Sequence, residues 1–348
     1  MDSSVAALLL KRQGYNVIGL FMLNWEEDDP NGACTAESDF ADVRRVCSLL
    51  DMPYYSVNFS KQYQERVFKH FLQEYAKGRT PNPDVLCNRE IKFGPFRDYA
   101  LSLGADFIAT GHYCGIDHSD DGRHYLLKAA DRNKDQTYFL NQVTQTQLSN
   151  VLFPLAGMPK DEVRRIAEEN GLATAKKKDS TGICFIGERN FRKFLMEYLP
   201  AQPGKILTLD GEEVGEHVGL MHYTIGQRRG VNLGGKSGEA GRWFVVKKDV
   251  KNNILYVSHG DESPLYSKSC EVSGLNWIGI DPPISPVECT AKFRYRQDEQ
   301  KVTVIPTAQG VTVLFAEKQR AVTEGQYAVF YDDTRCLGGG VIDKVNFS

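Results

Sequence analysis

Helical and strand-like patterns alternate along the first half of the chain, and this alternation restricts the fold more than any other feature. The strand-like runs lie at 17–22, 54–58 and 106–110, whereas amphipathic helical patterns cover 3–14, 37–50 and 61–77. Parallel strands joined by helices of this length need right-handed crossover connections. The alternation therefore predicts an α/β domain with a doubly wound parallel sheet.

The second half of the chain has a different pattern. From about Gly204, short β-rich runs separated by glycine and proline replace the amphipathic helices, which is typical of all-β modules. A chain of 348 residues is long enough for two or three domains. We predict the α/β domain over residues 1–200, a small β-rich module over 201–268 and a C-terminal β-barrel over 269–348.

Composition excludes several classes of protein. The apolar run Val5–Leu10 is too short for a membrane span or a signal peptide. The eight cysteines show no C-x2-C or C-x4-C spacing, which argues against a zinc ribbon and favours thiols in a reducing cytosol. The formal net charge of −3 excludes a bulk polycation but allows basic patches such as Arg228-Arg229 and Lys247-Lys248. We expect a cytoplasmic monomer without membrane contact.

The residues before the first helical pattern, Asp2-Ser3-Ser4, can by type alone form a helix cap. They also resemble the end of the S-G-G-x-D-S loop of ATP pyrophosphatases, with Asp2 and Ser3 at its last two positions. In doubly wound folds, a strand and a turn precede the first helix and hold phosphate. Because neither precedes Asp2, we expect the native protein to begin about 10 residues upstream, the length of one strand and a turn.

Residues 78–93 form the most informative segment. Two prolines stiffen it, so we expect Asn82 and Asp84 in a fixed extended geometry. Cys87 is expected to begin a helix whose dipole, with nearby basic residues, favours a thiolate. The residue types alone also allow Cys87 to be a small buried apolar side chain.

A second cysteine, Cys184, lies between Gly182 and Gly187, which indicates a loop that can swing towards Cys87. Three lysines at 176–178 would lower the pKa of this thiol if they lie close to it. The alternative is that these lysines form only a solvated helix end.

Both cysteine segments, together with residues 19–25, 109–113 and 134–140, resemble the tRNA-specific 2-thiouridylase family. The resemblance runs from Asp2 nearly to the C-terminus. It implies an adenine-nucleotide-binding fold of the ATP-pyrophosphatase type, followed by the β-rich module and the barrel. It also implies ATP-dependent adenylation of the C2 oxygen of the wobble uridine, then persulfide sulfur transfer that gives 2-thiouridine, AMP and pyrophosphate. The implied partners are tRNA, ATP with Mg²⁺, and an upstream protein that carries persulfide sulfur.

The resemblance assigns roles by position. In catalysis it implies Cys87 as nucleophile, Cys184 as persulfide carrier, and Asp84 and Asp2. For the nucleotide it implies Asp2, Ser3, Ser4, Met22 and Gly111. For tRNA it implies Asn82, Pro83, Asp84, His112, Lys134, Asp135, Gln136, Arg294, Tyr295 and Gln326. An Arg-Tyr-Arg run at 294–296 is expected on a strand, with both arginines on one side. For His112 alone, a structural histidine is the alternative.

Several alternatives stay open at the level of sequence. Sulfur can leave Cys184 as sulfide or attack C2 directly as the persulfide. An iron–sulfur cluster would find only three potential ligands in Asp84, Cys87 and Cys184, and so would need an open site. The chain could also be a tRNA-binding protein that has lost adenylation, another ATP pyrophosphatase, or a thiol redox protein.

Overall fold

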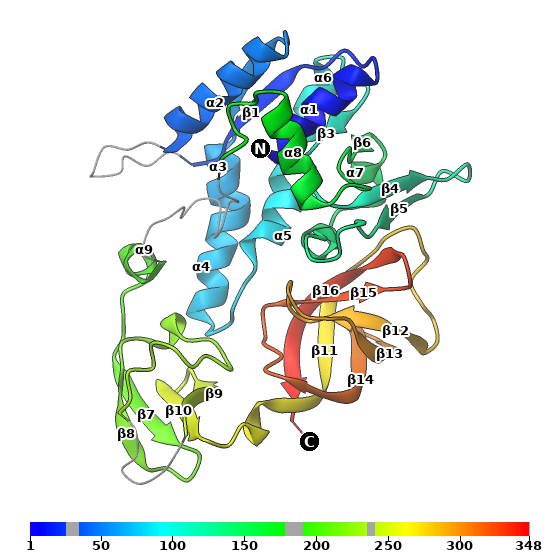
Figure 1. The fold of residues 1–348 in the computed structure, drawn as a ribbon. Helices are drawn as coiled ribbons and strands as arrows, with labels where there is room; N and C mark the ends of the chain where they lie inside the picture. The colour runs from blue at the N-terminus through cyan, green and yellow to red at the C-terminus, as the bar shows by residue number, and fades with distance from the viewer. Residues whose placement is uncertain (26–34, 178–190, 235–240, 348) are drawn as a thin grey trace.

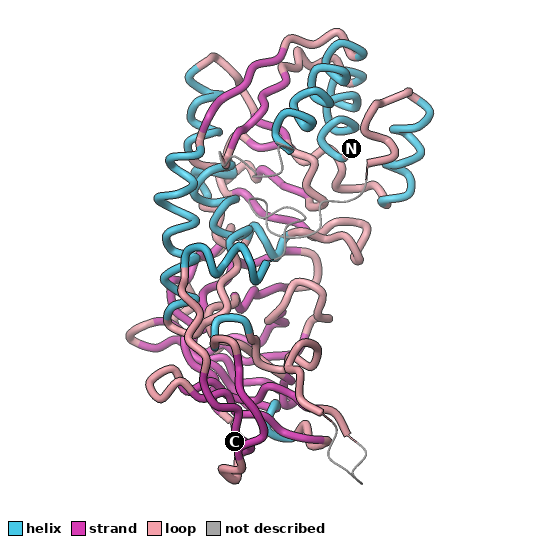
Figure 2. Tube along the Cα trace, turned by 90° about the vertical axis from the view of Figure 1, so that its left-hand side faces the viewer, coloured by secondary structure: helices cyan, strands magenta, loops and turns pink. Residues whose placement is uncertain are grey.

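A computed structural model describes residues 1–25, 35–177, 191–234 and 241–347. Figure 1 shows an α/β region at one end of the molecule and two β-rich lobes side by side at the other. In the view turned by 90°, most helices lie in the upper half and most strands in the lower half (Figure 2). The predicted order of an α/β part followed by two β-rich parts is confirmed. No helix in the described residues is long and apolar enough to cross a membrane.

The α/β region contains parallel strands, as predicted. Strand β1 (Gly19–Leu23) pairs in parallel with β2 (Tyr54–Asn58), and β3 (Ile108–Ala109) pairs in parallel with β6 (Val151–Leu152). Within the described ranges these two pairs form separate two-stranded sheets. The hydrogen-bonded sheet is therefore present in two pieces rather than as one continuous layer.

Helices pack around these strands (Figure 1). The helices before β3 are α1 (Asp2–Arg12), α2 (Thr35–Leu49), α5 (Pro83–Cys87) and α6 (Pro95–Ser102). The helix predicted over 61–77 is α3 (Ser60–Tyr63), a π-helical turn (Gln64–Phe68) and α4 (Lys69–Ala76) in direct succession. A second π-helical turn (Asn88–Lys92) follows α5 directly. Later in the chain come α7 (Gln145–Leu148), α8 (Lys160–Glu169) and α9 (Phe191–Tyr198).

The interpretation of Ser3 and Ser4 as a helix cap is wrong. Helix α1 begins at Asp2 with Met1 at its N-cap position, and no side chain caps it. The serines lie inside the first turn, and the hydroxyl of Ser4 accepts a hydrogen bond from Thr174 Oγ1 at 3.1 Å. The predicted end of the helix is correct, because Gly14 follows it with φ of +89°.

The two β-rich lobes form separate sheets. In the smaller, strands β7 (Gly204–Thr208), β8 (Glu213–His217), β9 (Trp243–Asp249) and β10 (Ile254–His259) lie in the order β8-β7-β10-β9. The barrel contains β11 (Tyr266–Trp277), β12 (Val287–Lys292), β13 (Gln300–Thr307), β14 (Gly310–Arg320), β15 (Tyr327–Tyr331) and β16 (Arg335–Asn346). Pairing of β11 with β16 closes it.

A hairpin from the α/β region extends the sheet of the barrel. Strands β4 (Gly115–His118) and β5 (His124–Leu127) form this hairpin, and β5 pairs with β16. One apolar core accordingly contains residues from both regions, such as Val85 and Ile108 from the first and Val329 from the barrel. The two predicted domain boundaries stay predictions; one sheet and one core connect the α/β region directly to the barrel.

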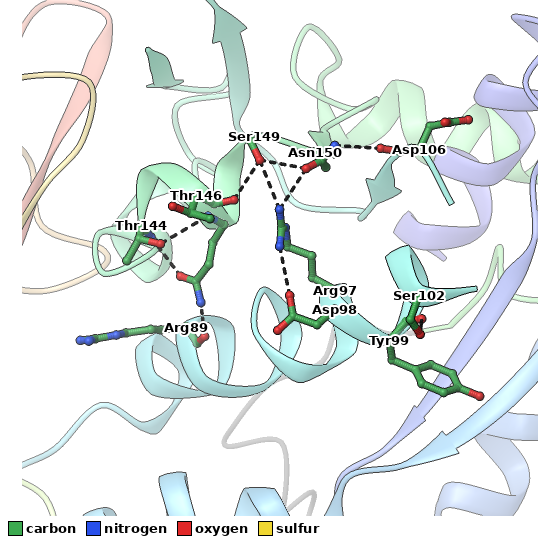
Figure 3. A network of polar contacts seen from close by, with 11 residues as sticks. Arg89, Arg97, Asp98, Tyr99, Ser102, Asp106, Thr144, Thr146, Ser149 and Asn150 are labelled. Carbon is green, nitrogen blue, oxygen red and sulfur yellow. Dashed lines mark hydrogen bonds and ion pairs between the residues drawn. The ribbon is translucent and has the colours of Figure 1, made fainter. Parts of the chain in front are cut away.

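A polar network joins α6 to the segment between α7 and β6 (Figure 3). Arg97 is buried, and its Nη2 donates to Ser149 Oγ at 3.2 Å and to Asn150 Oδ1 at 2.9 Å. Asn150 Nδ2 in turn donates to the carbonyl oxygen of Asp106 at 3.0 Å, just before β3. The network thus positions β3 relative to α6.

We predict that Arg97→Ala lowers the free energy of unfolding by about 2 kcal/mol, because it removes a buried charged donor from two half-buried acceptors. Asp98 also contacts Arg97, but its side chain is 69% exposed. Asp98→Ala should therefore cost less than about 1 kcal/mol. Urea unfolding of both variants measures the difference, and equal losses would contradict this account of the network.

Candidate functional site

Gly111 lies against the first turn of α1. A Cβ atom at this position would stand 2.6 Å from the backbone nitrogen of Ser3 and 2.7 Å from the carbonyl carbon of Asp2. Only glycine permits so close an approach of the two backbones. The structure thus brings together the residues predicted at the nucleotide, Asp2, Ser3 and Gly111, where the segment after β3 meets the N-terminus of α1.

The carboxylate of Asp2 is held from two sides. Lys160 Nζ, at the start of α8, lies 2.8 Å from Oδ1 and 2.9 Å from Oδ2. The hydroxyl of Tyr113 donates to Oδ1 at 3.1 Å. The Lys160 side chain is only 9% exposed, so its ammonium depends on this carboxylate for compensation. The Asp2–Lys160 pair is neutral overall, so an anionic ligand at this point would be attracted mainly by the N-terminal end of the α1 helix dipole.

His112 links the Asp2–Gly111 contact to the segment that contains Cys87. Lys92 Nζ lies 3.5 Å from its Nε2 and Thr110 Oγ1 lies 2.7 Å from its Nδ1. Because an ammonium only donates, Nε2 accepts and the ring proton lies on Nδ1, facing the threonine. Burial and, second, the charge of Lys92 lower the pKa of His112 well below its ordinary value. The same lysine donates to Asn88 Oδ1 at 3.0 Å, one residue after Cys87.

Residues 134–136 contact the backbone of the segment that carries Gly111 and His112. Gln136 Oε1 accepts from the backbone nitrogen of Tyr113 at 2.9 Å. Asp135 is buried and accepts from the backbone nitrogens of Ala129 and Thr137 and from the Thr137 hydroxyl. Burial raises the pKa of Asp135, and these hydrogen bonds oppose the rise. The predicted tRNA contacts of 134–136 stay predictions; Asp135 and Gln136 use their side chains inside the fold.

The expectation that Cys87 begins a helix is wrong. Asn82 caps α5 by accepting from the backbone nitrogen of Asp84 at 3.2 Å, and Pro83 occupies the first turn. Cys87 is the last residue of α5, and the chain continues without interruption into the π-helical turn. The positive end of the helix dipole therefore lies at Asp84 rather than at the thiol.

Cys87 is 2% exposed and belongs to an apolar cluster with Tyr63, Phe68 and Ile91. Met22, near the carboxyl end of β1, packs against the same cluster. Cys87, predicted for sulfur transfer, and Met22, predicted for nucleotide binding, thus share one apolar core. Cys184 lies outside the described residues, so its approach to Cys87 stays a prediction. Cys47, Cys114, Cys270, Cys289 and Cys336 are thiols, as predicted.

The predicted tRNA residues of the barrel lie at internal contacts. Gln326 Nε2 donates to the carbonyl oxygen of Thr80 at 2.6 Å, two residues before Asn82. Tyr295 lies on Phe139, with 4.4 Å between ring centroids. The structure therefore brings Gln326 near Asn82, Pro83 and Asp84, while Tyr295 contacts the α/β region at another point.

Residues 294–296 do not form a strand. They lie in a turn between β12 and β13, where the backbone nitrogen of Gln297 donates to the Arg294 carbonyl. Arg294 Nη2 donates to the carbonyl oxygens of Ala321 at 2.6 Å and Ile225 at 3.2 Å, so it links barrel and smaller lobe. Burial lowers the pKa of Arg294. The expected pair of arginines on one strand face is thus wrong.

Two lysines organise this region: sequence reasoning missed Lys160 and treated Lys92 only as one of the basic residues near Cys87. Each stands in an ordinary helical pattern, and only the fold shows that they face Asp2 and His112. Sequence reasoning also treated Lys248 as a surface charge, although this half-buried side chain donates to the carbonyl oxygen of Gly78. No group of three or more His, Cys, Asp or Glu able to hold a metal ion occurs in the described part of the chain.

Three family models match consecutive parts of the chain. They are described as a tRNA methyl transferase HUP domain over residues 1–188, a tRNA methyl transferase PRC-barrel domain over 192–259, and an aminomethyltransferase beta-barrel domain over 267–342. With the close contact of Gly111 and α1, these matches define an α/β HUP-domain protein that carries two C-terminal β modules.

Full-length relatives specify the family. The chain is 57% identical over 347 residues to the tRNA-specific 2-thiouridylase MnmA of Alkaliphilus oremlandii, covering 99% of this chain and 95% of that protein. It is 59% identical to the protein of the same description from Lactococcus lactis subsp. cremoris and to MnmA 2 of Geobacillus kaustophilus, covering 99% of this chain and 92% of each. The chain belongs to the tRNA-specific 2-thiouridylase MnmA family.

We predict that His112 stays neutral in the pH range just below 6.5, the ordinary pKa of histidine. Its pKa in the folded protein lies below the ordinary value of 6.5, so protons bind to the unfolded chain first and acid lowers stability in this range. The ring resonances of labelled histidine, with His112→Gln to assign them, measure the charge directly. A His112 signal that titrates near pH 6.5 would contradict the proposed contact with Lys92.

Proposed function

We propose that this protein is a tRNA-uridine 2-sulfurtransferase that uses ATP to convert the wobble uridine of tRNA to 2-thiouridine. The full-length identity of 57–59% to proteins described as tRNA-specific 2-thiouridylases carries the proposal. The contact between Gly111 and the first turn of α1 supports it, because the N-terminal end of a helix suits the phosphates of a nucleotide.

Adenylation comes first in the proposed reaction. The C2 oxygen of uridine attacks the α-phosphorus of ATP, the bond to the β-phosphate breaks, and pyrophosphate leaves. The oxygen then departs with AMP, a far better leaving group than oxide. Asp2, Ser3, Ser4 and Gly111 would bind ATP at the N-terminus of α1, and Met22 would contact the adenosine. Both oxygens of Asp2 are within reach of Lys160, so Mg²⁺ would be held mainly by ATP phosphates.

Sulfur arrives in the second half-reaction. Cys184 would carry it as a persulfide received from an upstream protein. In one route Cys87 attacks the inner sulfur, a Cys87–Cys184 disulfide forms, and the released sulfide displaces AMP from C2. In the other, the terminal sulfur attacks C2 and Cys87 then cleaves the link to Cys184, with the same disulfide as product. Both routes require a reductant to restore the two thiols. Asp84 would accept the proton from Cys87.

The test is nucleoside analysis after incubation with ATP, a persulfide donor and tRNA. The parent should form 2-thiouridine and release AMP and pyrophosphate. Cys87→Ser and Cys184→Ser should each reduce 2-thiouridine at least a hundredfold, because each removes a sulfur atom from the transfer. Cys289→Ser, a half-buried barrel thiol, serves as the control.

Two results would overturn parts of this proposal. If the parent binds tRNA but forms neither 2-thiouridine nor tRNA-dependent pyrophosphate, the protein is a binding protein rather than an enzyme. If both serine variants form as much 2-thiouridine as the Cys289 variant, sulfur does not pass through these cysteines.

We predict that Gly111→Ala weakens ATP binding at least tenfold, about 1.4 kcal/mol. The new Cβ atom would lie 2.6 Å and 2.7 Å from backbone atoms of α1, which must shift. Gly157→Ala is the matched control, because its Cβ atom meets no atom within 4 Å. Isothermal titration of both variants with ATP makes the comparison, and equal affinities would place the nucleotide away from Gly111.

A further inference from the structure

The short connection between α4 and α5 is bonded to both β-rich lobes. We call residues 78–81 the strap. Lys248 Nζ, on β9 of the smaller lobe, donates to the carbonyl oxygen of Gly78 at 3.0 Å. From the barrel side, Glu324 accepts through its backbone oxygen from the nitrogen of Thr80 at 3.0 Å. Gln326 binds the carbonyl oxygen of the same threonine.

The backbone of the strap is also in tight contact with both lobes. Gly78 has φ of +75°, and a Cβ atom there would lie 2.4 Å from Val250 Cγ2. Gly325 of the barrel has φ of +86°, and its Cβ atom would lie 3.0 Å from Arg79 Cβ and 3.0 Å from Thr80 N. A shift of either lobe against the strap would break these close contacts. Both glycines have a positive φ, a backbone conformation that favours glycine.

Arg79 adds a charged link across the strap. Its Nη1 lies 3.4 Å from Glu74 Oε2 on α4 and 3.3 Å from Asp343 Oδ1 on β16. Its Nη2 donates to the backbone oxygen of Asp343 at 3.3 Å. Glu74 is buried, with its side chain 6% exposed, so this arginine joins a helix of the α/β region to the barrel.

The strap leads directly into the segment that carries the proposed nucleophile. Pro81 and Pro83 restrict the backbone on both sides of Asn82, the cap of α5. A displacement of the strap is therefore transmitted to Asp84 and Cys87. A cavity of about 190 Å³ lies beside the strap, between Arg79, Pro81 and Asn82 and the barrel, and leaves it space to move if its bonds are lost.

We propose that Lys248 and Asp343 are positioning residues of the sulfur-transfer reaction. Lys248 holds the strap from the smaller lobe and Asp343 holds it from the barrel. Together they set the position of α5, which carries Asp84 and Cys87. This inference rests on the proposed function. Neither residue touches the reacting atoms. The Lys248 ammonium is mostly buried, which lowers its pKa to about 8, so its placement against Gly78 costs desolvation that a surface lysine avoids.

The test compares Lys248→Met and Asp343→Ala with Lys251→Met, an exposed lysine in the turn after β9. Two readouts are used. The first is the pair of steady-state constants, kcat and KM, for the formation of 2-thiouridine. The second is the rate at which iodoacetamide alkylates Cys87, followed by peptide mass spectrometry.

Lys248→Met should lower kcat about tenfold with KM for ATP unchanged, because a misplaced nucleophile slows chemistry rather than ATP binding. Alkylation of the buried thiol of Cys87 should become several-fold faster as the strap loosens. Asp343→Ala should change both readouts in the same direction and by less, since the backbone oxygen of Asp343 still binds Arg79.

If both variants match Lys251→Met in kcat and in alkylation rate, the strap does not position α5 and the inference is wrong. Thermal unfolding of each variant identifies one that has failed to fold, and the other then decides. If the parent forms no 2-thiouridine at all, the proposed function fails, while the alkylation rates still report whether these residues position Cys87.

Discussion

The ion pair between Asp2 and Lys160 holds together the part of the molecule on which the rest of the site depends. The lysine is buried, and an ammonium in that place needs a carboxylate within bonding distance. The ion pair holds the first turn of α1 against the first turn of α8. The hydroxyl of Tyr113, in the segment after β3, donates to the same carboxylate. Gly111 lies against the backbone of the same first turn of α1. The N-terminus of α1 is therefore organised by the protein itself.

From this point a continuous series of contacts reaches both β-rich lobes. Gly111 is followed by His112, which binds Lys92, and Lys92 binds Asn88 beside Cys87. Upstream of Cys87, α5 is joined through the strap to β9 and to the barrel. Figure 1 shows why this is possible, since α4 extends from the α/β region towards the β-rich lobes and α5 lies beside it. The proposed nucleotide, sulfur and tRNA functions thus belong to one connected structure rather than to three independent modules.

The sequence predicts what depends on local pattern and fails where tertiary contacts decide. Strand β2 covers the predicted range 54–58, because its apolar run is bounded by turn residues. Helix α5 begins at Pro83 rather than at Cys87, the start predicted from the sequence. The prediction failed because an Asn-Pro pair suits an extended loop as well as the cap and first residue of a helix. Likewise, the hairpin of β4 and β5 joins the barrel through pairing with β16, more than 200 residues away in the chain, as Arg335 opposite Leu127 shows. No local signal contains such a pairing.

The internal use of basic residues changes how the charge of this protein should be understood. Arg294 and Lys248 were candidates for contacts to tRNA, yet both are half-buried and bind backbone oxygens of the protein: Arg294 those of Ala321 and Ile225, and Lys248 that of Gly78. Lys128 is equally engaged, with its Nζ 2.7 Å from Glu299 and only 6% of its side chain exposed. The cationic surface that remains for an RNA is therefore smaller than the 42 Lys and Arg residues of the chain suggest. Because phosphate contacts supply most of the salt-dependent affinity of nucleic acids, we expect tRNA binding to depend on the basic residues that stay exposed, such as Arg228.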